Sequence, residues 1–169
     1  PVGRKAQVAK EVQWVEDRRN KIMEVWEKVE SGEIPTRVTH NDTKINNILF
    51  TKEGKVLCVI DLDTVLSSTI LNDFGDAIRY YTNAGKEDEK DLNKVYMRLN
   101  IFEGFTKGYL SEAKSFLSDS EIKYLAFSAM YITIEQVLRF LMAHIDGDNY
   151  NRTEYEDHNL VRTRAQIKL

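Results

Sequence analysis

The strongest constraint on the fold is one short stretch of β pattern in a chain whose periodicity is otherwise helical. Residues 47–50 are mostly apolar, residues 52–55 (KEGK) have the composition of a turn, and residues 56–60 are apolar again. Two such runs joined by a short Gly-containing loop predict a β-hairpin. Because apolar residues recur with helical spacing on both sides, the sequence predicts a mainly α fold with a small β-hairpin insertion, in the α+β class.

Helix-stop and helix-start residues divide the helical parts. Residues 8–30 read as one amphipathic helix, which Ser31-Gly32 and Pro35 end. Ser118 and Glu121 form a capping box in front of a long apolar helix that reaches about residue 145. The remaining helices are expected from Asn72 or Asp73 to about residue 83, over a segment carrying Leu92, Val95, Leu99, Phe102 and Phe105, and from about residue 159 onwards.

Composition narrows the classes of function. The 169 residues suit a single domain, and the net charge of −3 disfavours a nucleic-acid partner. The single cysteine, Cys58, lies in an apolar run, where we expect a buried thiol, a reducing environment and a cytoplasmic location. The longest apolar stretch, residues 124–134, is too short to span a bilayer, so no membrane partner is expected.

A polar segment, THNDTKINNILF, leads into the first strand of the predicted hairpin. Lys44 follows Asp42 by two residues, and Asn47 follows Asp42 by five. Asp61 stands at the end of the return strand, so the hairpin folds it back beside Asn47. Three oxygen-bearing side chains, those of Asp42, Asn47 and Asp61, therefore meet at one end of a two-stranded unit.

These residue types suit phosphoryl transfer. The oxygens of Asn47 and Asp61 are ligands that Mg²⁺ accepts, since this ion takes few protein ligands and completes its shell with water and phosphate. Asp42 is then available to orient and deprotonate a hydroxyl nucleophile, and Lys44 to lie against the transferred phosphate. A positioned base, metal ligands and charge neutralisation are the components that this reaction requires.

The segment HNDTKINN resembles the catalytic loop of the kinase superfamily, H-x-D-x-x-x-x-N. The closer resemblance is to the aminoglycoside phosphotransferase-like family, also called the phosphotransferase enzyme family. Five segments in order carry it over nearly the whole chain, and together they are most similar to N-acetylhexosamine 1-kinases. The segments are RVTHNDTKINNILF, VIDLDT, DFGDAIR, LRFL…GD and HNLVRTRAQ.

The resemblance implies a role for each matching residue. Asp42 is expected to be the catalytic base, and His40 to support the loop through hydrogen bonds instead of reacting. Asn47 and Asp61 are expected to bind Mg²⁺, and Lys44 is expected to contact the phosphate of ATP. Asp73 resembles the structural aspartate that braces the catalytic loop.

Asp63 and Asp73 are two further aspartates close to the predicted site. Two roles are open for Asp63: it is either a second metal ligand or a hydrogen-bond acceptor in its loop. Residues 73–75 spell DFG, the metal-binding triplet of protein kinases, but they lie twenty-six residues past Asn47 and open a helix. The metal carboxylate is therefore assigned to Asp61 and the bracing role to Asp73.

The acceptor site rests on weaker signals. Arg139 lies in an apolar helix, where we expect it to be buried, either paired with Glu135 one helical turn away or hydrogen-bonded to a sugar. The resemblance favours contacts from Arg139 and Tyr150 to the anomeric end of an N-acetylhexosamine. Acidic residues between positions 146 and 157 leave a cationic acceptor open, as in aminoglycoside or choline kinases, and homoserine is a further alternative.

The resemblance covers only the C-terminal lobe of a protein-kinase-like fold. No G-x-G-x-x-G and no strand-borne Lys precede the first helix, so the N-terminal lobe is expected to be absent and the chain alone to turn over little or no ATP. Within the lobe of residues 1–169 we expect a leading helical segment (1–38), the catalytic loop and metal-binding hairpin (39–66) and a helical acceptor-binding part (67–169).

Two rival functions remain. The D-x-D of Asp61 and Asp63 resembles the nucleophile motif of haloacid dehalogenase-type phosphatases, but Thr64 stands where those proteins carry Gly, and helices follow in place of strands. A truncated, non-catalytic binding module is the other rival.

Overall fold

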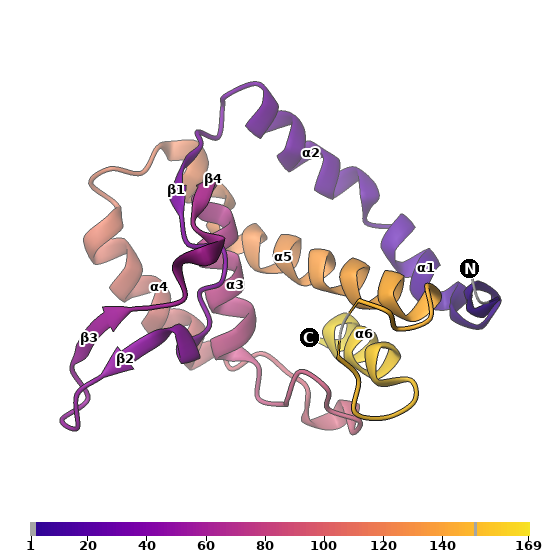
Figure 1. Ribbon diagram of the computed structural model, residues 1–169. Coiled ribbons are helices and arrows are strands. Elements are labelled where there is room, and N and C mark those ends of the chain that lie inside the picture. Colours follow the sequence, from indigo (N-terminus) through magenta and orange to yellow (C-terminus); the bar gives the residue numbers. More distant parts are fainter. Residues whose placement is uncertain (1–2, 151) are drawn as a thin grey trace. The chain divides into compact units, whose positions relative to one another are not determined.

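The computed structural model describes residues 3–150 and 152–169, and it is mostly helical with two small β-sheets (Figure 1). This arrangement agrees with the expected α+β class. The chain forms two compact units. Unit 1 comprises the described residues up to Val25, Asn83–Arg98 and the described residues from Thr133 onwards; unit 2 comprises Trp26–Thr82 and Leu99–Ile132.

The elements follow one another along the chain in a simple order. The α-helices are α1 (Ala9–Glu16), α2 (Arg19–Glu30), α3 (Ile70–Thr82), α4 (Leu99–Ala113), α5 (Asp119–Ile145) and α6 (His158–Lys168). The strands are β1 (Arg37–Thr39), β2 (Ile48–Phe50), β3 (Val56–Val59) and β4 (Leu66–Ser68). The short 3₁₀ helices in the described part of the chain are η1 (Arg4–Val8), η2 (Ile45–Asn47), η3 (Leu62–Thr64) and η4 (Leu92–Lys94).

The two sheets belong to unit 2 and enclose two loops. β2 and β3 form the predicted antiparallel hairpin, with Ile48 opposite Val59 and an irregularity between Leu49 and Phe50. β1 and β4 form a second antiparallel pair, with Thr39 opposite Leu66, which the sequence did not indicate. Residues 40–47 therefore connect one sheet to the other, and residues 60–65 return, so that both loops are held at each end by strand pairing.

The N-terminal helix is broken where the sequence predicted one continuous helix. α1 ends at Glu16 and α2 begins at Arg19. The Arg18 guanidinium donates to the Trp14 carbonyl at 2.9 Å and stacks 3.9 Å from the centre of the Trp14 ring. This side chain competes for a carbonyl that the next helical turn would otherwise use, which is a local cause for the break.

Two other helix limits differ from the prediction. α3 begins at Ile70, so Asn72 and Asp73 lie in its first turn and are not its N-cap. Leu92 lies in η4 and Val95 follows it, so the helix that carries Phe102 begins only at Leu99. Because Asp73 lies inside the first turn of α3 and does not cap it, its carboxylate accepts hydrogen bonds from the loop that begins at His40.

The capping box of α5 is confirmed and ties β1 to this helix. Ser118 Oγ accepts from the Glu121 amide at 3.2 Å, and the Ser118 amide donates to Glu121 Oε2 at 2.7 Å. The Arg37 guanidinium adds bonds of 2.7 and 2.9 Å to the same buried carboxylate. Burial alone would raise the pKa of Glu121, but the hydrogen bonds from Arg37 and Ser118 lower it, so the pair stays ionised at neutral pH.

By length and composition, α5 is long and apolar enough to cross a membrane, so the expectation that no apolar segment reaches that length is wrong. In the structure, 44% of its most apolar window is buried. Leu125, Ile132, Val137 and Leu141 recur along it as buried residues, which is typical of a core helix in a folded domain.

Exposed apolar side chains gather along residues 38–66, most of them on the β2–β3 hairpin and on the segment that follows it. All four residues of β3 are exposed, so this strand is covered on neither face. Cys58 is for that reason exposed and not buried as expected. The large apolar side chains exposed over this region are Val38, Ile45, Leu49, Phe50, Val56, Leu57, Val59, Ile60, Leu62, Val65 and Leu66.

Within unit 2, α3 packs against α4 and, at Gly75, closely against α5. Phe74 is 1% exposed, so the middle residue of the DFG triplet is a core residue. A Cβ added at Gly75 would meet the Ser128 carbonyl oxygen and lie 2.7 Å from Ile132 Cγ1. Gly75 is therefore required for close helix packing, which accounts for the triplet without any metal.

We predict that Gly75→Ala destabilises the protein. The added methyl meets a backbone oxygen that cannot move cheaply, so the free energy of unfolding should fall by about 1–3 kcal/mol in urea denaturation. Gly104→Ala is the matched control, because Gly104 is an exposed residue of α4 with open space where its Cβ would stand. The control should gain about 0.5–1 kcal/mol from helix propensity, and a loss equal to that of Gly75→Ala would contradict the packing argument.

Candidate active site

The loop of residues 40–47 is anchored to α3 through one carboxylate. Asp73 Oδ2 accepts from the His40 amide at 2.9 Å, and Asp73 Oδ1 accepts from the Asn41 amide at 2.7 Å. Two successive backbone N–H groups are thus satisfied by a side chain from the first turn of α3. This is the bracing geometry that the resemblance implies for Asp73.

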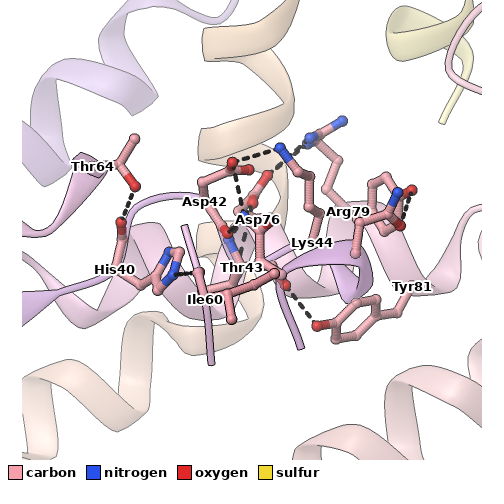
Figure 2. A network of polar contacts seen from close by, with 12 residues as sticks. His40, Asp42, Thr43, Lys44, Ile60, Thr64, Asp76, Arg79 and Tyr81 are labelled. Atoms are coloured by element: carbon pink, nitrogen blue, oxygen red, sulfur yellow. Dashed lines mark hydrogen bonds and ion pairs between the residues drawn. The ribbon is translucent and has the colours of Figure 1, made fainter. Parts of the chain in front are cut away.

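The other side of the loop is anchored to the return segment. His40 Nε2 donates to the Ile60 carbonyl at 2.9 Å, and Thr64 Oγ1 donates to the His40 carbonyl at 2.6 Å (Figure 2). Asn41, at φ 63°, donates from Nδ2 to the carbonyls of Thr39 and Thr64. His40 Nε2 is therefore engaged as a donor to the return segment, and Nδ1 is buried without a hydrogen-bond partner among the described residues.

Asp42, Lys44 and Asn47 converge at the centre of the loop. Lys44 Nζ lies 2.6 Å from Asp42 Oδ2, and Asn47 Nδ2 donates to Asp42 Oδ2 at 3.0 Å and to the Asp42 carbonyl at 2.8 Å. The hydrogen bond to Asp42 raises the pKa of Lys44, with further contributions from the charges of Asp61 and Asp76, against the opposing effect of burial. Lys44 is accordingly a stable cation beside the carboxylate.

Asp61 is brought to the same place by strand pairing. The Ile60 amide donates to the Asn47 carbonyl at 2.9 Å, which extends the β2–β3 ladder by one bond beyond Ile48 and Val59. The next residue, Asp61, has φ 65° and is one of four residues other than glycine with positive φ in the described chain. Such backbone conformations are concentrated at functional sites in proteins, and Asn41 of the same loop has one too.

The donor set at this point fits Mg²⁺. Because Asn47 turns its Nδ2 toward Asp42, its Oδ1 is the atom left to accept or to ligate, and the side chain is 4% exposed. Among the described residues, no group of three or more His, Cys, Asp and Glu could hold a metal by itself. Two protein oxygens, from Asn47 and Asp61, match an ion that takes its other ligands from water and phosphate. Asp63 is exposed in η3, and its role as a second ligand stays a prediction.

A cavity of about 480 Å³ adjoins the loop within unit 2. Asp42, Lys44 and Asn47 form part of its lining. Aromatic residues of α3 and α4 form another part, with Tyr81 and Phe105 packed edge to face and their ring centres 5.4 Å apart. A small molecule in this cavity would have Asp42 and Lys44 on one side and aromatic rings on the other.

The predicted acceptor residues lie in unit 1. Arg139 and Tyr150 line one cavity there, of about 530 Å³, with an apolar part from Leu138 and Met142. Arg139 is exposed, so the expectation of a buried arginine is wrong. It lies on the solvent side of α5, where a charged head group needs no buried partner. Tyr150 is 80% exposed, and the substrate roles of both residues stay predictions.

Four residues of the network were not assigned to the site from the sequence. Thr43, which was expected to be a turn former, contacts α3 through its backbone and its hydroxyl, and its partners there include Asp76 and Tyr81 (Figure 2). Arg79 pairs with Asp76 at 2.8 Å. The segment DFGDAIR contains Asp76 and Arg79 and was quoted for its resemblance, but nothing in their spacing indicated a contact with Thr43.

Residues 3–104 match the family profile described as the phosphotransferase enzyme family. The match covers more than half of the chain, including the whole of the loop and of α3. The chain therefore belongs to the phosphotransferase enzyme family, whose members are kinase-type enzymes that typically use ATP and Mg²⁺.

We predict that Asp73→Asn loosens the loop. An asparagine can accept only one of the two backbone N–H groups, so the other would face an amide NH₂. The free energy of unfolding should fall by about 1–3 kcal/mol, and the His40 and Asn41 amides should exchange faster with solvent. Asp63→Asn, a charge-matched change at an exposed position, should alter neither quantity; equal behaviour of the two variants would contradict the bracing role.

Proposed function

We propose that this chain carries the catalytic loop of an ATP-dependent phosphotransferase that phosphorylates a hydroxyl group of a small molecule. One observation carries the proposal. The Asp42 carboxylate is held by Lys44 and Asn47 at 2.6 and 3.0 Å, and the β2–β3 ladder brings Asp61 beside them. The residues proposed as base, cation and metal ligands thus lie close together in sequence and fold, and a cavity adjoins Asp42, Lys44 and Asn47.

In the proposed mechanism, the hydroxyl oxygen of the acceptor attacks the γ-phosphorus of ATP, and Asp42 accepts the proton of that hydroxyl. The bond between that phosphorus and the bridging oxygen breaks, and ADP leaves. Lys44, beside Asp42, would offset negative charge on the transferred group. Asn47 and Asp61 would hold Mg²⁺, which neutralises phosphate charge when bound.

The acceptor that we propose is the anomeric hydroxyl of an N-acetylhexosamine. Within unit 1, the cavity lined by Arg139 and Tyr150 supports the binding of a sugar, since it combines hydrogen-bonding groups with an apolar part that suits an acetyl methyl. Phosphorylation by this proposal requires in addition that the anomeric hydroxyl reach Asp42 in unit 2. Asp146 and Asn149 add further polar groups to the same lining. This choice of acceptor rests on the sequence resemblance together with that composition.

A cationic alcohol is the second candidate acceptor. The cavity beside Asp42 combines carboxylates with the aromatic residues Tyr81, Phe105 and Tyr109. Aromatic faces together with negative charge favour quaternary and other organic ammonium groups. Choline and aminoglycosides carry such groups next to hydroxyls.

We further propose that turnover requires a nucleotide-binding lobe in addition to the residues described, and that the protein acts in the cytoplasm. The exposed apolar side chains of β2 and β3, such as Leu49, Phe50 and Leu57, support a covering partner for this hairpin. A two-stranded sheet exposed on both faces is marginally stable in water without such cover. Robust ADP release by the purified chain alone would contradict the requirement.

Replacing the proposed base should slow the reaction without preventing binding. In an active preparation that contains this chain, Asp42→Asn should lower kcat by about 10²–10⁴-fold, since general-base catalysis contributes that much. Asp61→Ala should abolish the use of Mg-ATP while leaving acceptor binding measurable by calorimetry. Glu53→Gln, an exposed change in the hairpin turn, is the control. An unchanged kcat in Asp42→Asn would remove Asp42 from the role of base.

An acceptor panel separates the two candidate substrates. Thermal unfolding of the chain would be followed with N-acetylglucosamine, N-acetylgalactosamine, glucose, choline and kanamycin, because a ligand that binds only the folded state raises Tm. The acetylated sugars should raise Tm more than glucose, and Arg139→Ala should remove the effect. A rise with choline or kanamycin alone would favour the cationic acceptor and contradict the sugar.

A further inference from the structure

Thr43 lies in the sequence between Asp42, the proposed base, and Lys44, the proposed phosphate-binding cation. Its amide, its hydroxyl and its carbonyl are all hydrogen-bonded to residues of α3. Its amide donates to Asp76 Oδ2 at 3.0 Å. Its hydroxyl donates to the Asp73 carbonyl at 2.7 Å. Its carbonyl accepts from the Tyr81 hydroxyl at 2.6 Å. The peptide groups on both sides of Thr43 are therefore fixed by one helix.

Asp76 is itself held in a single orientation. Its Oδ1 accepts from Arg79 Nη2 at 2.8 Å and from Nε at 3.3 Å, which leaves Oδ2 directed at the Thr43 amide. Asp76 and Arg79 are 7% and 8% exposed. A buried carboxylate of this kind is retained only with a partner charge, so Arg79 both neutralises Asp76 and fixes the direction in which it accepts.

Tyr81 secures the second peptide group from the far end of α3. Its ring packs edge to face with Phe105 at 5.4 Å and with Tyr80 at 6.1 Å, so the ring stays in place without the hydroxyl. Burial, with a contribution from the charge of Asp76, raises the pKa of Tyr81 to about 12. The phenol is thus protonated at neutral pH, and the Thr43 carbonyl accepts its hydrogen bond.

We propose that Asp76 and Tyr81 are positioning residues, which set the direction of the Asp42 carboxylate by fixing the two peptide groups of Thr43. The inference rests on the proposed function, since it presumes that Asp42 is the base. Figure 2 shows the arrangement: the side chains of Asp42, Lys44, Asp76, Arg79 and Tyr81 gather around Thr43. The bonds from α3 end on the backbone of the loop, so their effect on catalysis is indirect.

The test compares variants that remove one hydrogen bond and no packing. In an active preparation, Tyr81→Phe should lower kcat by about 10-fold, because misplacing a reacting group by about 1 Å can cost about 10²-fold and one bond is a part of the restraint. KM for the acceptor and for Mg-ATP should stay within about 2-fold. Tyr155→Phe in unit 1 is the control, because the Tyr155 hydroxyl is buried and has no hydrogen-bond partner among the described residues. An unchanged kcat in Tyr81→Phe below its Tm would overturn the proposal.

A second pair of variants guards against misfolding. Thr43→Val loses the hydroxyl bond to Asp73 but keeps the shape of the side chain, and Thr43→Ser keeps that bond. Thr43→Val should show the same loss of kcat as Tyr81→Phe, and Thr43→Ser should show a smaller loss than Thr43→Val because it keeps the hydroxyl bond. The double variant Tyr81→Phe with Thr43→Val should lose less than the product of the two single losses, because both act through one segment. Full additivity would contradict a shared route through Thr43.

The failure of this inference can be told apart from the failure of the proposed function. If Asp42→Asn abolishes turnover and Tyr81→Phe does not change it, only the positioning role is lost; if Asp42→Asn has no effect, the function itself is wrong. A readout without turnover uses this chain alone. The side-chain carboxyl carbon resonance of Asp42 should shift in Tyr81→Phe and stay in place in Tyr155→Phe, and no shift in either would overturn the positioning role.

Discussion

The hydrogen bonds that α3 donates and accepts along the loop are the interactions on which the rest of the site depends. Asp73 accepts from two successive amides and Asp76 from a third, so backbone groups that a polar loop would expose to water are paired with fixed carboxylates. A loop held in this way loses its conformational freedom on folding and not on substrate binding. Asp42 and Asn47 therefore occupy their relative positions before any ligand arrives.

Strand pairing adds the component that helix α3 cannot provide. β1 pairs with β4 and β2 with β3, so the loop and the return segment are closed at both ends. The β2–β3 ladder extends to Ile60, whose amide donates to the Asn47 carbonyl, so that Asp61 follows close to Asn47. His40 Nε2 donates to the carbonyl of the same Ile60. The short β insertion thus brings the side-chain oxygens of Asn47 and Asp61 toward each other, although the two residues are fourteen positions apart in the sequence.

The hairpin and the helix cap were predicted correctly because each depends only on interactions between residues that are close in the sequence. The hairpin and the Ser118–Glu121 capping box follow from turn and cap chemistry within a few residues. Exposure depends on what surrounds an element, so the exposed Arg139 could not be read from an apolar helix pattern. The partners of Thr43 were likewise beyond reach, because Asp76 follows it by 33 residues and only the packing of α3 brings them together.

The most direct test of this account is where a paramagnetic metal–nucleotide complex binds. Mn²⁺ with ATP would be titrated into isotope-labelled protein, and the broadening of backbone and side-chain resonances would be mapped along the chain. Broadening centred on Asn47 and Asp61 and extending to Asp42 is the result that the loop geometry predicts. Broadening centred on Asp73 and the following residues, or spread evenly over exposed carboxylates, would contradict the assignment of the metal site and with it the proposed chemistry.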